Sequence, residues 1–487
     1  MHYKEPKNRY QLLMSICLDD FIPPNNPVRI IDAFIENIVD NNPEKFRYKG
    51  QNNIGQKAYS PKTFLKLYMY GYSNSITSSR KLEIEAQRNI EVKWLLGDLQ
   101  PDFKTIADYR KDNREQVKLV AREIRKFLKD QEMIDGELVA IDGTKVKANA
   151  NRNILNVKKI KNRLKEIDQQ IDKYLEEIKI QDIEEEIIEE ENIDEPSQIN
   201  KQAIKRIAKL QEEIEELKEA QAKLESSERN HISLTDKDAA LMKMRGGSTP
   251  GYNIQAAVDS KNMMIMGNYA TDTHVDYEET NKMIKKLKQE YSKGPSKLTL
   301  DKGYYKLDNL ANAALKDDVE CFLPVPDSKY DDEEITFEYD EEEDRYICSE
   351  GEPLELVSKN VKKRGTLADR YRGTNCNECS RKSACTKSKK GRMKYRYKNQ
   401  EWRDKFKEKM KTAEAKEIIE KRKGIVEHVF GTIKYWMGKI PIKLRGIKKV
   451  ETEISLYSTA YNIKRMMNID SYQSIMKSIN EYEWKVV

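Results

Sequence analysis

The first 130 residues place apolar and polar positions with the 3.6-residue period of amphipathic helices. The pattern predicts a helix over 28–40 and a second one opening at Ser60-Pro61, where serine caps and proline occupies the first turn. Residues 75–113 predict two further short helices joined by a turn at 97–102, a candidate helix-turn-helix. An ordinary helical bundle with a basic face explains the same spacing. A following amphipathic helix carries Val117, Val120, Ile124 and Leu128.

Short apolar runs follow between residues 137 and 325. The segments ELVAID and KLTLD predict strands that end in Asp142 and Asp301. Between them, residues 252–272 predict a β-hairpin turning at 259–262, followed by a helix over 276–291. A helix over 307–316 and the strand VECFLPV complete the series. This order predicts a mixed α/β sheet with helices that can cover it.

Two heptad stretches interrupt the predicted sheet protein. Apolar residues recur at alternating spacings of three and four over 154–178 and over 204–224, separated by an acidic linker at 179–203. This spacing favours helices that meet along one seam. We therefore expect an inserted antiparallel coiled-coil hairpin, or helices that pair with another subunit.

The charges lie in blocks, although the net charge is only +6. Residues 357–400 hold 15 Lys or Arg against two acidic residues, with Tyr395 and Tyr397 among them. Residues 176–195 and 331–344 each have a balance of −10. Blocks like these are typical of solvated or interacting segments, and a basic block with aromatic residues suits a polyanion.

Two aspartates are the first candidates for chemistry. If the strands ending in Asp142 and Asp301 are neighbours in one sheet, their carboxylates emerge side by side at one edge. An acid there is costly to bury unpaired, but it is a suitable ligand for a hard cation. Each aspartate taken alone also fits a plain turn residue.

A third acid lies on a helix expected over about 401–437, before a last helix near 449–467. The predicted apolar stripe of this helix would pack on the sheet, and Lys423, Glu427 and Lys434 fall on a neighbouring stripe. Glu427 either binds a metal between two cations that contact DNA phosphates, or makes ordinary helix-stabilising charge contacts. The stripe consists of Ile419, Val426, Phe430, Ile433 and Met437.

Nearly the whole chain resembles bacterial insertion-sequence transposases of the DDE class. The resemblance rests on these motifs: YSPKTFLKLYMYGYSNSITSSRKLE, PDFKTIADYRK, AIDGTKVKANAN, TDKDAALMKMRGGSTPGYNIQAAVD, LDKGYY and IVEHVFGTIK. It implies an RNase H-like catalytic core, of which 133–152 and 229–325 would be the first parts and 401–487 the C-terminal part. It also implies a helical N-terminal DNA-binding domain at 1–132, with the coiled-coil hairpin insertion at 153–228 and an acidic, then Cys-rich basic insertion at 326–400.

Carried over to this sequence, the resemblance implies that Asp142, Asp301 and Glu427 bind Mg²⁺ or Mn²⁺, with two ions expected. Two metal ions can stabilise the attacking and the leaving oxygen of a phosphodiester. Related transposases often place a tyrosine seven residues and an arginine four residues before the glutamate, where this chain has Glu420 and Lys423. The residues expected to contact DNA are Arg80, Arg110, Lys145, Lys302, Lys423 and Lys434.

Four of the six cysteines fall within the insertion. Cys376 and Cys379 have the spacing of a zinc knuckle, and Cys385 and Cys348 would complete a four-thiolate Zn²⁺ site. The alternative is a cluster of reduced thiols in a basic loop.

The leading hypothesis is a DNA transposase that binds the inverted-repeat ends of its element, cleaves there and joins the 3′-hydroxyl to target DNA. A nuclease of the same fold without strand transfer and a domesticated DNA-binding protein are the alternatives. A homo-oligomer is expected, because two double-stranded ends must be held together. The sequence shows no apolar run of membrane-spanning length and no signal peptide, so we expect a cytoplasmic, nucleoid-associated prokaryotic protein without a membrane partner.

Overall fold

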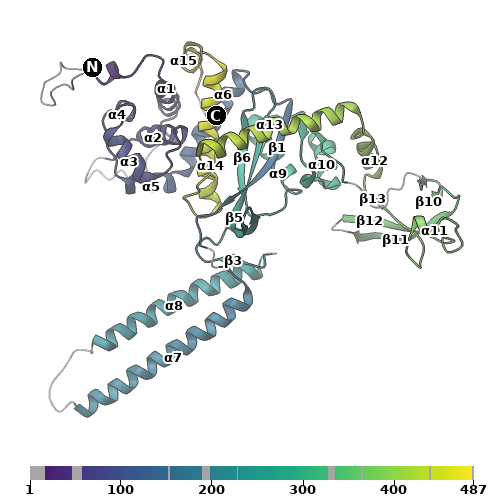
Figure 1. The fold of residues 1–487 in the computed structure, drawn as a ribbon, viewed down its shortest axis with the longest axis horizontal. Coiled ribbons are helices and arrows are strands. Elements are labelled where there is room, and N and C mark those ends of the chain that lie inside the picture. Colours follow the sequence, from purple (N-terminus) through teal and green to yellow (C-terminus); the bar gives the residue numbers. More distant parts are fainter. Residues whose placement is uncertain are drawn as a thin grey trace, which may run out of the picture.

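A central sheet with three attached parts makes up the fold in the computed structural model (Figure 1). Helices from the N-terminal third lie on one side, a long helical hairpin projects away from the sheet, and a small second sheet lies on the side opposite the N-terminal helices. The structure describes residues 17–46, 58–151, 154–188, 198–226, 229–326, 335–363, 366–437 and 440–484.

The N-terminal third is helical, as the periodicity predicts. It contains η1 (Leu18–Phe21), α1 (Pro27–Asp40), α2 (Pro61–Ser73), α3 (Ser79–Arg88), α4 (Ile90–Leu96), α5 (Phe103–Asp112) and α6 (Arg114–Asp130). The prediction of one helix before the turn at 97–102 is wrong, because Asn89 divides that segment into α3 and α4. The Asn89 side chain accepts hydrogen bonds from the backbone of Glu91 and Val92, which caps α4 and stops α3.

The central sheet has the mixed topology expected of the RNase H-like fold. Strands β1 (Leu138–Lys147), β5 (Gly247–Asp259) and β6 (Ile265–Thr271) are antiparallel neighbours, and β6 pairs only with β5. On the other side of β1, strands β7 (Lys297–Thr299) and β8 (Glu320–Phe322) run parallel to it. The expected fold class is therefore confirmed. Strand β4 (Ala240–Met244), which pairs with the start of β5, was not predicted.

Helices cover this sheet and connect it to the N-terminal helices. They are α9 (Glu279–Tyr291), α10 (Leu307–Asp317), α12 (Gln400–Lys409), α13 (Ala413–Met437), α14 (Ile447–Ile469) and α15 (Tyr472–Glu481). Helix α13 crosses the sheet, and α14 lies between β6 and helices α2 and α6 (Figure 1). Burial on all sides of α14 explains why its sequence has no polar face. The single helix predicted over 401–437 is wrong, because Thr412 bonds to Lys409 and Ala415 and separates α12 from α13.

The helical hairpin consists of α7 (Val157–Ile188) and α8 (Gln198–Glu225), which pack against each other. Short strands β2 (Ile154–Leu155) and β3 (Ile232–Ser233) pair at its base. Apolar residues at the predicted heptad positions, including Ile160, Ile167 and Leu217, form its core. Both helices extend further into the expected acidic linker than predicted, and residues 189–197 of that linker lie outside the described residues.

The second sheet contains five antiparallel strands in the order β13-β12-β11-β10-β9. These strands are β9 (Phe337–Asp340), β10 (Arg345–Cys348), β11 (Pro353–Lys363), β12 (Thr366–Gly373) and β13 (Met393–Tyr397), with α11 (Lys382–Cys385) in the last connection. The sequence reading predicted no strand here. Charged residues alternate with aromatic ones in β9 and β13, and Tyr346, Leu354 and Tyr371 form a small buried cluster among the described residues. Residues 331–334 of the acidic block lie outside the described part.

Candidate active site

Asp142 and Asp301 lie at the same level of two adjacent parallel strands. Strands β1 and β7 pair from Leu138 opposite Lys297 to Ala140 opposite Thr299. Continuing this register by two residues places Asp142 beside Asp301. Asp301 caps the short turn η2 (Lys302–Tyr304) and accepts a hydrogen bond of 2.7 Å from the Gly303 backbone. Asp301 follows the end of β7, but Asp142 lies inside β1, which continues to Lys147, so the predicted end of this strand at Asp142 is wrong. The two acids still lie side by side on adjacent strands.

The Asp142 carboxyl is the most perturbed acid at this edge. Burial raises its pKa to about 6, and the negative charges of Asp301 and Asp276 contribute in the same direction. The Arg422 guanidinium, 3.6 Å from Asp142 Oδ2, and the Gly143 backbone N–H oppose this rise. A cation bound here would stabilise the ionised form of this buried carboxyl and offset the repulsion from the neighbouring acids.

Asp276, which sequence reasoning missed, is the third carboxylate of this edge. It precedes α9 and accepts hydrogen bonds from Asn253 Nδ2 at 2.7 Å and Gln255 Nε2 at 2.8 Å. Both donors lie on β5 and are almost fully buried. Tyr304 in turn donates to Gln255 Oε1 at 2.5 Å, which fixes the orientation of that amide. The only sequence signal was an acid just before a predicted helix, which usually indicates a cap.

Gly143 leaves the space in which these polar groups meet. A Cβ atom at this position would lie 2.5 Å from Gln255 Nε2 and 2.9 Å from Asp276 Oδ1. No side chain fits at those distances without displacing the amide or the carboxylate. The glycine of the AIDGT motif is thus required by the close approach of β5 and Asp276 to β1.

Glu427, the third predicted acid, lies on α13. It is exposed on α13, and its sequence neighbours Ile425 and Val426 are buried. Among the described residues, no three or more His, Cys, Asp or Glu side chains are arranged to hold a metal ion. The structure therefore brings Asp142 and Asp301 together, and the metal-binding role of Glu427 stays a prediction.

Arg422 lies on a different face of α13 from Lys423 and Glu427. The apolar stripe of α13 includes Ile418, Ile425 and Val429 as well as the predicted positions, and Arg422 lies on that wider stripe. It therefore faces the sheet and Asp142. Lys423, the predicted counterpart of the relatives' arginine, is exposed.

The other residues predicted to contact DNA differ in accessibility. Arg80, Lys145, Lys302 and Lys434 are exposed and keep that predicted role. The Arg80 guanidinium stacks over the Phe103 ring at 4.8 Å, and Lys434 lies 5.8 Å from the Phe430 ring.

Arg110 requires a correction, because it is only 3% exposed. Its Nη1 donates to the Tyr72 hydroxyl and to the Thr77 carbonyl, both at 3.0 Å, and lies 3.9 Å from Glu453. A guanidinium with these partners cannot reach DNA in this structure. It connects α5 to α14 instead.

The four cysteines of the insertion line one small pocket of about 30 Å³. The backbone N–H of Arg392 donates to Cys376 Sγ at 3.3 Å, and burial raises the pKa of Cys385. The thiols of Cys348, Cys376 and Cys379 also raise that pKa, which shows that the four groups are neighbours. The second sheet supplies Cys348, and the connection from β12 to β13 supplies the other three.

Two parts of the chain match models of known families. Residues 347–467 match a family described as a transposase DDE domain, and residues 16–112 match a transposase domain family designated DUF772. Both are transposase families. The transposase resemblance inferred from the motifs is thereby confirmed. The DDE match runs from β10 to α14, so it includes Glu427 but neither Asp142 nor Asp301.

A solved structure similar to this chain is the cryo-EM structure of the piggyBac transposase synaptic complex with hairpin DNA. The match has 10% sequence identity and a TM-score of 0.28, and it covers 93% of this chain and 79% of that chain. A likeness at this TM-score carries no argument about this chain. Among curated proteins, none matches the sequence significantly. Within the described ranges, no helix has the length and apolar character needed to cross a membrane.

Proposed function

We propose that the protein is a metal-dependent DNA transposase that binds the ends of an insertion sequence, cleaves the phosphodiester and joins the 3′-hydroxyl to target DNA. The observation that carries this proposal is the meeting of Asp142 and Asp301 at one sheet edge, in a chain with two transposase domains. The role of each group follows from its surroundings.

The carboxylate edge has the donor set of a magnesium or manganese site. Asp142 and Asp301 would hold the ions, because both are oxygen ligands on adjacent strands and burial raises the pKa of Asp142, which a nearby cation would lower. When bound, two Mg²⁺ ions would stabilise the attacking and leaving oxygens of the phosphodiester. The buried amides of Asn253 and Gln255 orient Asp276 toward the same edge. Arg422 adds a positive charge 3.6 Å from Asp142.

Glu427 and Asp276 are two candidates for the third carboxylate of this centre. The family resemblance favours Glu427, and the observed proximity to Asp142 favours Asp276. Asp142→Asn, Asp301→Asn and Glu427→Gln are each expected to abolish cleavage of a duplex carrying a transposon end with Mg²⁺. The assignment of Glu427 is wrong if Glu427→Gln cleaves normally and Asp276→Asn does not.

The proposed DNA surface combines the N-terminal helices with the basic second sheet. In that sheet, the Arg396 guanidinium lies 3.5 Å from the centre of the Tyr339 ring, and the Lys394 ammonium lies 4.5 Å from that of Phe337. Cations stacked on aromatic rings keep their positive charge, which favours a polyanion nearby. Affinity for duplex DNA is therefore expected to fall steeply with increasing salt.

A strand-transfer assay separates this function from the alternatives. The purified protein is incubated with Mg²⁺, a labelled end oligonucleotide and a plasmid target. A transposase yields joined product, whereas cleavage without joining supports the nuclease. Binding of the end without cleavage supports a domesticated DNA-binding protein.

We propose that the helical hairpin of α7 and α8 contributes to a homo-oligomer that holds two DNA ends. Leu175, Ile180 and Ile204 on the hairpin are 44%, 57% and 58% exposed, so they are apolar positions left uncovered by the α7–α8 pairing. Light scattering of the full chain tests this proposal. Replacing all three residues with Gln should shift the protein toward monomer, and an unchanged mass would contradict the role of the hairpin.

Zn²⁺ is proposed at Cys348, Cys376, Cys379 and Cys385. All four line one pocket, and the N–H of Arg392 directed at Cys376 Sγ is a donor suited to a thiolate. Zinc–sulfur bonds of about 2.3 Å would draw the four sulfurs closer together. Purified native protein should contain about one zinc per chain, and Cys376→Ser should lose it. Cys17→Ser, at an exposed thiol outside the cluster, is the control. Native protein free of zinc would exclude the site.

A further inference from the structure

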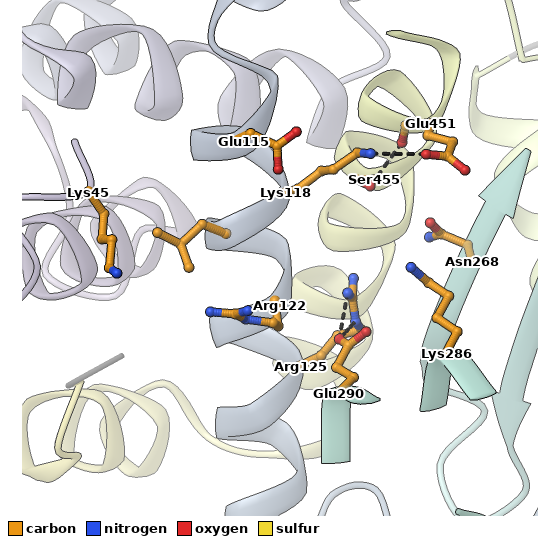
Figure 2. Close-up of a pocket in the computed structure, with 11 residues that line it drawn as sticks. Lys45, Glu115, Lys118, Arg122, Arg125, Asn268, Lys286, Glu290, Glu451 and Ser455 are labelled. Atoms are coloured by element: carbon orange, nitrogen blue, oxygen red, sulfur yellow. Dashed lines mark hydrogen bonds and ion pairs between the residues drawn. The ribbon is translucent and has the colours of Figure 1, made fainter. Parts of the chain in front are cut away.

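A second polar pocket lies away from the carboxylate edge, beside the open edge of the central sheet. It has a volume of about 430 Å³ and is lined by residues of α6, α9, α14 and the edge strand β6 (Figure 2). Five Lys or Arg and three Glu line it, and none of its residues belongs to the carboxylate edge. Cations therefore outnumber acids in a partly enclosed space.

Ion pairs satisfy some of these charges. Lys118 Nζ lies 2.9 Å from Glu451 Oε2, across the gap between α6 and α14. Arg125 Nη2 lies 2.5 Å from Glu290 Oε1, and both of these side chains are 7% exposed. Figure 2 draws both pairs on the walls of the pocket. These pairs hold α6 to α14 and α9, and they leave other donors without an acceptor.

Three nitrogen donors from three elements line this pocket. Arg125 Nη1 on α6 and Asn268 Nδ2 on β6 are buried and make no hydrogen bond among the described residues, although the Tyr291 hydroxyl lies beside the Arg125 guanidinium. The Lys286 ammonium on α9 has no ion pair within the described part of the chain. In Figure 2, Lys286 and Asn268 direct their nitrogen atoms toward the Arg125 guanidinium. Arg125 and Asn268 are each only 6% exposed, so bulk water reaches them poorly.

The electrostatics of Lys286 agree with this geometry. Burial lowers its pKa most, and the positive charges of Arg125 and Lys118 lower it further, although Glu290 and Glu451 act in the opposite direction. Leaving a buried donor unsatisfied is unfavourable, and more so when the group is charged. A ligand with several negatively charged oxygens would accept from all three donors and offset the excess positive charge.

We propose that this pocket binds an oxyanion of the phosphate class through Arg125, Asn268 and Lys286. The oxygens of a tetrahedral phosphate point in several directions. They can therefore accept hydrogen bonds from donors on three different elements, α6, β6 and α9. The Arg125–Glu290 pair fixes the guanidinium so that Nη1 is presented to the ligand. The phosphate is either a free ion or a group on a DNA strand, and both share this chemistry.

Calorimetric titration of the full chain with sodium phosphate, against sodium chloride at matched ionic strength, tests the site. Phosphate should bind with a measurable heat that chloride does not give. Lys286→Met should weaken phosphate binding by at least about tenfold, which corresponds to ~1.4 kcal/mol. Asn268→Ala should weaken it by a smaller factor. Lys285→Met is the control, since Lys285 is exposed on the same helix and does not line the pocket.

Equal phosphate affinity of native protein and Lys286→Met would overturn the proposal, and so would heats that do not differ between phosphate and chloride. Unfolding curves of each variant exclude loss of the fold as the cause. A duplex oligonucleotide added as competitor identifies the source of the phosphate. Displacement of phosphate, with weaker duplex binding by Lys286→Met, indicates a DNA phosphate. Phosphate binding that the duplex leaves unchanged indicates a free ion. The carboxylate edge is not involved, so these outcomes are independent of the cleavage assay.

Discussion

Asp142→Asn removes a carboxylate whose ionisation lowers the free energy of unfolding. Burial and neighbouring acids raise the pKa of Asp142 from 3.8 to about 6, and one pKa unit corresponds to about 1.4 kcal/mol. Ionised Asp142 therefore costs the folded state up to about 3 kcal/mol. The side chain is only 21% exposed, so solvent screening reduces this value little.

The sign of the pH dependence follows from the direction of the shift. Well below pH 3.8 the carboxyl is protonated in the folded and unfolded chain alike, so it contributes no difference. Between pH 3.8 and about 6 the unfolded chain is ionised while the folded chain keeps its proton, so native stability falls as the pH rises and then levels off above about 6. The free energy of unfolding of Asp142→Asn, minus that of the native chain, should therefore grow by up to about 3 kcal/mol between pH 4 and pH 7.5.

Urea unfolding of both proteins in EDTA, at several pH values across this range, measures the difference directly. Glu420→Gln is a matched control, because Glu420 is an exposed acid on α13 and water solvates it in both states. Adding Mg²⁺ at pH 7.5 should raise the stability of the native chain more than that of Asp142→Asn. A stability difference that stays constant from pH 4 to pH 7.5 would refute the assignment of Asp142 as a buried acid that ionises at a cost.

Two further substitutions, one at the carboxylate edge with its control and one between α5 and α14, test packing. Gly143→Ala should destabilise the fold by about 1–3 kcal/mol in urea unfolding and reduce cleavage, because its methyl would displace Gln255. Gly431→Ala, at an exposed and open helical position, should instead gain about 0.5–1 kcal/mol; equal effects of the two substitutions would contradict this reasoning. Arg110→Ala should cost about 3–5 kcal/mol by leaving Glu453 buried without its cation, measured in the same way. A loss of DNA affinity by Arg110→Ala at unchanged stability would restore its predicted contact with DNA.

Local sequence determined the type of most elements. The helical period of apolar residues predicted the N-terminal helices and the helical hairpin. An amphipathic helix must bury its apolar stripe, whichever element it packs against. The apolar runs before Asp142 and Asp301 predicted strands, and a common edge was expected if those strands are neighbours, as the parallel pairing of β1 with β7 shows. The second sheet escaped prediction because charged residues dominate its strands and few of its side chains are buried. A pattern of hydrophobicity cannot indicate a strand that buries so little.

Only the tertiary structure decided which polar side chains meet. Asp276 and Gln255 are far apart in the sequence, and neither belongs to a run that marks it as functional. No sequence pattern singled out Arg422, and packing of α13 turns it toward Asp142. The sequence predicted that Arg110 contacts DNA, but α14 covers this residue in the folded chain. The sequence specifies which residues are charged or apolar. Which of them are buried, and which lie close together, depends on how distant elements pack, and this packing sets the pKa of Asp142 and the partners of each cation.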